Sequence, residues 1–81
     1  MDEIDQDLDL EISEIYEWLC VEALPDQRPR LNQVFTLSND LPGDALELMA
    51  QRDWLRPQGD GRAMLTAKGL AELKRRGFAP L

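Results

Sequence analysis

The side chains that usually carry acid–base, nucleophilic or metal chemistry are nearly missing from this chain. Its 81 residues include no histidine and one cysteine, Cys20. Ordinary zinc sites draw their ligands from histidine and cysteine, so such a site is not expected. The usual pairs of a nucleophile and its base are missing too. We therefore expect a protein that is not an enzyme and uses no metal or cofactor.

Carboxylates are plentiful, and they are unevenly distributed along the chain. Residues 1–24 carry nine acids and no base, whereas residues 25–81 carry seven acids and nine bases. The formal net charge of −7 therefore hides a mildly basic body behind an acidic start. No pattern pairs the carboxylates across a recognisable cleft. The charge is expected to act in binding, where local charge matters more than total charge.

Length and composition indicate one globular domain. Apolar residues make up 43% and charged residues 31% of the chain, and no apolar run is long enough to span a membrane. The acidic start does not resemble a secretory signal. A single cysteine cannot form an internal disulfide, and we expect Cys20 to be a buried small side chain. These features suit a cytoplasmic protein.

An amphipathic helix is predicted over residues 8–24, after an acidic arm at 1–7. Its apolar residues recur with helical spacing, and either Asp7 or Asp9 is expected to cap it. Pro25 ends it, because the residue before a proline avoids the helical region. The apolar positions of this helix are Leu8, Ile12, Ile15, Tyr16, Leu19, Cys20 and Ala23.

The second half of the chain predicts a helix at 42–52, strands at 54–57 and 62–65, and a helix at 67–76. The turn between the strands is Gly59-Asp60-Gly61, whose residues tolerate positive φ. Pro57 marks the end of its strand or a bulge. The return strand is too short to decide its phase, so either Met64 or the pair Ala63 and Leu65 faces inward.

The junction before the last helix carries the most specific local signals. Thr66 is a plausible N-cap, and Gly77 suits the position just past the helix end. Gly69 lies inside the helix, where glycine costs about 1 kcal/mol relative to alanine. A close approach of another backbone, most simply that of the hairpin, would explain it. The run Lys74-Arg75-Arg76 is the best basic patch or, equally, a solvated helix end.

The sequence Leu65-Thr66-Ala67-Lys68-Gly69-Leu70, directly after a glycine-tipped hairpin, resembles the Leu-Thr-x-Lys-Gly junction of winged helix-turn-helix proteins. The junction is frequent in the broad group of MarR-like and PadR-like bacterial regulators, where it joins the second wing strand to a helix. The resemblance covers roughly the C-terminal half of the chain.

That resemblance implies an α+β fold with a three-helix helix-turn-helix core, a two-stranded β-wing and a C-terminal helix. The ambiguous segment 30–37 becomes its second helix, although its valine, phenylalanine and threonine also favour a strand. The domain spans 8–77, and the tail 78–81 either folds onto the core or stays free. The predicted core is Ile12, Ile15, Leu19, Val34, Leu41, Leu48, Met49, Leu55, Leu65, Leu70 and Leu73.

One functional reading implied by the resemblance is a DNA-binding transcription regulator. The helix at 42–52 would enter the major groove and the wing would contact the backbone. The candidate DNA-binding residues are Arg28, Arg30, Gln51, Arg52, Arg62 and Lys68. The groove helix also presents Asp44 and Glu47, which oppose phosphate binding.

The alternative reading is a protein-interaction module on the same scaffold, because fold alone does not fix function. The acidic first helix would bind a basic protein, mimic nucleic acid, or form a homodimer seeded by Trp18 and Tyr16. The candidate residues for this contact are Glu11, Glu14, Trp18 and Glu22. The two readings differ in whether the exposed face of the helix at 42–52 is acidic or is surrounded by converging cations.

Overall fold

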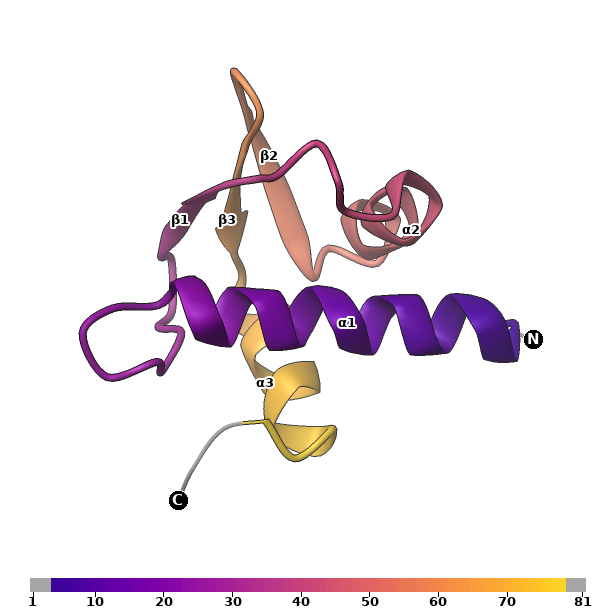
Figure 1. Cartoon of the computed structure of the whole chain (residues 1–81), viewed down its shortest axis with the longest axis horizontal. Coiled ribbons are helices and arrows are strands. Elements are labelled where there is room, and N and C mark those ends of the chain that lie inside the picture. The colour runs from indigo at the N-terminus through magenta and orange to yellow at the C-terminus, as the bar shows by residue number, and fades with distance from the viewer. Residues whose placement is uncertain (1–3, 79–81) are drawn as a thin grey trace.

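Helix α1, Gln6–Glu22, crosses the middle of the molecule, with the sheet and α2 on one side and α3 on the other (Figure 1). The computed structural model describes residues 4–78. It is a small α+β fold of three helices and a three-stranded antiparallel sheet. The remaining elements are β1 Val34–Thr36, α2 Gly43–Gln51, β2 Leu55–Gly59, β3 Arg62–Leu65 and α3 Ala67–Arg75.

The N-terminus of α1 is capped by Asp5, whose carboxylate accepts a hydrogen bond of 3.0 Å from the backbone N–H of Asp7. The expected caps, Asp7 and Asp9, were therefore wrong, and the helix starts two residues earlier than predicted. The reason is that helical hydrogen bonding already begins where Asp9 N–H donates to the Asp5 carbonyl at 2.8 Å, so Asp7 and Asp9 both lie inside the first turn. Of the expected acidic arm at 1–7, residues 1–3 lie outside the described part of the chain.

The sheet has the strand order β1-β3-β2, so β3 is central. The hairpin between β2 and β3 turns at Asp60 and Gly61, which both have positive φ, as the sequence predicted. Pro57 pairs with Ala63 on the edge strand, and a bulge lies between Pro57 and Gly59. A proline is tolerated at that place because the N–H it lacks is not needed by an inner ladder.

The helix expected at 30–37 does not form, and that prediction was wrong. Asn32 adopts a left-handed φ of 64°. The backbone around it is bound to β3: Asn32 N–H donates to the Leu65 carbonyl, and Leu65 N–H donates to the Gln33 carbonyl, each at 2.8 Å. Because its valine, phenylalanine and threonine favour a strand, the segment pairs with β3 and forms strand β1. The order therefore does not form a clear three-helix core, and the expected two-stranded wing belongs to a three-stranded sheet.

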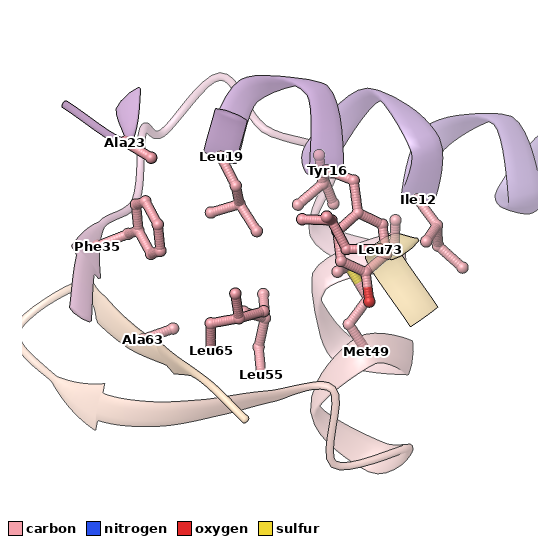
Figure 2. Close-up of a cluster of buried hydrophobic side chains, with 12 residues drawn as sticks. Ile12, Tyr16, Leu19, Ala23, Phe35, Met49, Leu55, Ala63, Leu65 and Leu73 are labelled. Carbon is pink, nitrogen blue, oxygen red and sulfur yellow. The ribbon is translucent and has the colours of Figure 1, made fainter. Parts of the chain in front are cut away.

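The core lies between α1, α2, α3 and the inner face of the sheet (Figure 2). Seven predicted core residues are buried: Ile12, Ile15, Leu19, Met49, Leu55, Leu65 and Leu73. The prediction that Val34 belongs to the core was wrong, since its side chain is 47% exposed, whereas its neighbour Phe35 is buried. One step along a strand reverses the facing of every side chain. Ala63 and Leu65 face inward, which settles the phase of β3.

Several side chains around this core differ from the prediction. Leu41, Leu48 and Leu70 are half-buried at its rim rather than inside it. Tyr16 is fully buried on α1 and stacks on Phe78 with ring centroids 6.2 Å apart. Phe78 thus folds onto the core, whereas residues 79–81 of the predicted tail lie outside the described residues.

The junction of β2, β3 and α3 closes around Gly69. The Thr66 side chain accepts a hydrogen bond of 2.9 Å from Gly69 N–H, which makes Thr66 the N-cap as predicted. A Cβ atom added to Gly69 would overlap the Trp54 backbone carbonyl. The predicted close approach to the hairpin is therefore confirmed. Gly77 lies just past the end of α3 with a φ of 84°, as predicted, and the next residue, Phe78, donates its N–H to the Leu73 carbonyl at 3.1 Å.

Arg76 joins α3 to α1 through a half-buried ionic cluster. Its side chain is only 7% exposed and donates to Glu72 and to Asp9, each at 2.6 Å, and to the Ser13 hydroxyl at 2.8 Å. Arg75 also pairs with Glu72. Two of the three cations in the predicted basic patch are therefore engaged with carboxylates, and the patch is reduced to Lys74.

We predict that Gly69→Ala lowers the free energy of unfolding by about 1–3 kcal/mol, because backbone atoms must move to admit the new methyl group. Gly43→Ala is the matched control, since nothing lies within 4 Å of the added Cβ. That variant should stay within about 1 kcal/mol of the parent or exceed it. Urea denaturation measures both. Equal stability of the two variants would contradict the close approach.

We predict that acid weakens the fold partly through Glu72. Hydrogen bonds from Arg75 and then from Arg76 hold the pKa of its carboxyl below the ordinary value of 4.5. Because the folded pKa is the lower one, this stabilisation is present above about pH 4.5 and is lost as pH falls through the folded pKa. Urea denaturation at a series of pH values should show a smaller loss for Glu72→Gln than for the parent. Identical losses would exclude this contribution.

Candidate functional site

The residues that the structure describes do not gather metal ligands, and two reactive side chains of α1 have raised pKa values. No group of three or more histidine, cysteine, aspartate or glutamate side chains between residues 4 and 78 is placed to hold a metal ion. Cys20 is half-buried, and burial, with a contribution from Glu17, raises the pKa of its thiol. Burial, assisted by Glu72, also raises the pKa of the Tyr16 phenol. Both shifts favour the neutral, unreactive form of the side chain.

The outward face of α2 is acidic. Asp44, Glu47 and Gln51 are all exposed, and they line a hollow beside α1. Arg52, at the end of this helix, packs over the Trp54 ring with its guanidinium carbon 5.8 Å from the centroid. Two of the four polar side chains expected in a DNA groove therefore carry negative charge, which repels phosphate.

The other candidate DNA-binding residues are only partly brought together. Arg30 pairs with Asp26 at 2.7 Å in the loop after α1, and Arg28 lies exposed in the same loop. Arg62 lies 3.9 Å from Asp60 at the hairpin turn. Lys68 lines a hollow with Arg56, a cation that the sequence analysis had not selected. Gln51 and Arg52 belong to α2 and do not line that hollow.

Two of the four candidates for protein binding, Glu14 and Trp18, share one surface of α1. Glu14 and Trp18 line one hollow of ≈ 340 Å³ together with Glu17 and Val21. Leu10 is 58% exposed and Val21 is 53% exposed on the same side of the helix. We call these five residues the outer face of α1: Leu10, Glu14, Glu17, Trp18 and Val21. Helical spacing places them opposite the buried stripe of Ile12, Ile15, Tyr16, Leu19 and Ala23.

The sequence analysis missed part of this face. Glu14 and Trp18 were selected, whereas Leu10, Glu17 and Val21 were not. Their signal was present, because residues 10, 14, 17 and 21 repeat with spacings of four, three and four. Glu11 is half-buried and Glu22 is exposed, and both lie beside this face rather than on it. Tyr16 is buried, so it is not available to seed a homodimer.

Comparison of the chain with protein-family models, curated proteins and solved structures found no match. The site is therefore judged on its own chemistry. A separate finding is that no helix within residues 4–78 is long and apolar enough to cross a membrane.

We predict that the protein does not bind random-sequence duplex DNA at low salt, because the exposed side of α2 is acidic. Non-specific DNA binding typically shows a Kd of about 1–100 μM, so fluorescence anisotropy should stay flat up to about 100 μM protein. Binding that weakened steeply with salt and disappeared in Arg62→Ala and Lys68→Ala would contradict this expectation and favour the DNA reading.

Proposed function

We propose that this protein is a small, non-catalytic module that binds other proteins through the outer face of α1. The observation that carries the proposal is an exposed stripe on a central helix that is both apolar and acidic. Leu10 and Val21 are exposed beside Glu14 and Glu17, and the half-buried Trp18 lines a hollow with Glu14, Glu17 and Val21. Exposed apolar side chains gathered on one face indicate an interaction site, and tryptophan is enriched in the cores of protein interfaces.

The scaffold is best described as winged-helix-like. The Leu-Thr-x-Lys-Gly junction supports this, together with the cap from Thr66 and the hairpin that Gly69 approaches. The order of elements departs from a helix-turn-helix because β1 and a turn precede α2. A scaffold with a strand in place of a second helix between α1 and α2, and with acids on the exposed side of α2, favours protein binding over DNA binding.

The charge on the outer face defines the partner. Glu14 and Glu17 are exposed, and no ion pair engages either of them among residues 4–78. A partner that brings lysine or arginine beside apolar side chains would neutralise both carboxylates and cover Trp18 and Val21. Such complementarity speeds association and selects partners.

The test uses a synthetic amphipathic peptide of about 18 residues, long enough to form a helix, with leucine on one face and lysine on its flanks. In a Trp54→Phe background, Trp18 is the remaining tryptophan and reports binding. We expect a blue-shifted, saturable fluorescence change with a Kd in the micromolar range, roughly 1–100 μM. Glu14→Gln/Glu17→Gln/Val21→Gln should weaken the binding at least tenfold.

The control peptide carries glutamate in place of every lysine and should not bind. Circular dichroism checks that each variant folds. If the lysine peptide gave no change, or bound the triple variant as tightly as the parent, the outer face of α1 would not be a protein-binding surface.

A further inference from the structure

The sheet has a second face that is open. Side chains of successive strand residues alternate between the two faces. Phe35, Ala63 and Leu65 point to the core, so their neighbours Val34, Thr36, Arg62 and Met64 point away from it. Val34, Thr36 and Arg62 are exposed and Met64 is half-buried, so no helix in the described part of the chain covers this face.

The open face is apolar and cationic. A hollow of ≈ 400 Å³ lies where the face meets the start of α3, and Leu31, Met64, Arg56 and Lys68 line it. Leu31 is 52% exposed. We call these residues, with Val34 and Arg62, the open sheet face. It combines three apolar side chains with three cations.

Two carboxylates, Asp53 and Asp60, face this surface from the neighbouring segments. Asp53 lines the hollow and pairs with Arg56 at 3.1 Å, and Asp60 lies 3.9 Å from Arg62. All four of these side chains are at least 44% exposed, so both pairs are solvated and weakly held. Lys68 makes no ion pair with any residue between 4 and 78. The cations can therefore turn to carboxylates of another molecule.

We infer that the open sheet face binds the outer face of α1 of a second copy of this chain. The two surfaces have the same mixture of apolar and charged side chains with opposite sign. The inference rests on the proposed function for the α1 half of the contact. Trp18 is the bulkiest side chain on that half; it is half-buried against its own core, and its exposed edge would cover the hollow that Leu31 and Met64 line.

The contact has to be made between molecules and between unlike faces. In one molecule α1 packs its core side onto the inner face of the sheet, so its outer face and the open sheet face point in opposite directions (Figure 2). Two α1 outer faces would oppose Glu14 and Glu17 with their own copies, and two open sheet faces would oppose cations. Like charges brought together in this way disfavour both symmetric dimers.

A contact between unlike faces joins molecules head to tail, and because the two faces point in opposite directions we expect open-ended chains of molecules instead of a closed ring. One helix face on a three-stranded sheet is a small interface, and small interfaces are weak. We expect association with a Kd of roughly 1–100 μM. Salt should weaken its ionic part.

The experiment is sedimentation equilibrium of the full chain from about 1 to about 300 μM, a range that brackets this affinity. The average mass of the parent should rise beyond that of a dimer with concentration. Glu14→Gln/Glu17→Gln/Val21→Gln damages the α1 face, and Arg56→Glu/Lys68→Glu damages the sheet face. Each variant alone should associate at least tenfold more weakly. All five positions are exposed, and circular dichroism checks the folds.

Mixing the two variants is the decisive step. One still has an intact sheet face and the other an intact α1 face, so the mixture should form a capped one-to-one dimer and no longer chains. Glu47→Gln and Lys74→Glu, exposed changes on α2 and at the end of α3, should associate like the parent. A monomeric parent at all concentrations, a closed dimer, or a mixture that stays monomeric would each overturn the inference.

The sedimentation experiment and the peptide titration test different claims, so either one can fail while the other succeeds. If the parent protein binds the lysine peptide but remains monomeric, the proposed function is supported, and the inference that a second copy is the partner is wrong. If the parent protein forms chains but does not bind the peptide, the contact between copies is supported, and the outer face of α1 binds only other copies of this chain.

Discussion

The close packing of Gly69 against the Trp54 carbonyl determines how α3 is joined to the β2–β3 hairpin. Thr66 lies at the same point and links two segments of the chain. Its hydroxyl donates toward the carbonyls of Asp53 and Trp54 while accepting from Gly69 N–H. The connection between α2 and β2 and the first turn of α3 therefore share one hydroxyl group. If residue 69 carried any side chain larger than a hydrogen atom, α3 would lie farther from the hairpin, and Leu73 would lose its place in the core.

With α3 held there, α1 becomes a helix that is enclosed on two sides. Its core stripe meets the sheet and α2, and its lower flank meets α3 through Arg76 and the stacked rings of Tyr16 and Phe78. What remains free is the side farthest from the core. That side carries exposed apolar residues, although a helix in this position needs none for its own stability. Surface that is apolar without a structural need is the basis of both proposals.

The sequence predicted the elements that rest on strong local chemistry. Thr66, Gly69, Gly77 and the Asp60-Gly61 turn each stand where only a few residue types suffice, and each was confirmed. The β1 segment was missed because three residues carry too little periodicity, and pairing with β3 decided it. The same step of one residue exchanged Val34 for Phe35 in the core. Arg76 looked solvated because a run of cations gives no sign of a carboxylate that lies 67 residues earlier in the chain, at Asp9.

The candidate surfaces were only half predictable for the same reason. Trp18 and the glutamates stood out by type. The open sheet face combines Leu31, Met64, Arg56 and Lys68 from separate elements, and no spacing along the chain announces such a set.

The bulge and Pro57 on β2 also limit what this sheet can do. A strand at the margin of a sheet offers unpaired backbone groups to any extended peptide, and such margins cause cross-β aggregation. Here one margin carries a proline and a bulge, and the other is a strand of three residues. Neither offers a long backbone template. Molecules that meet at high concentration are thereby directed to contacts between side chains, which can come apart again, and away from irreversible fibres.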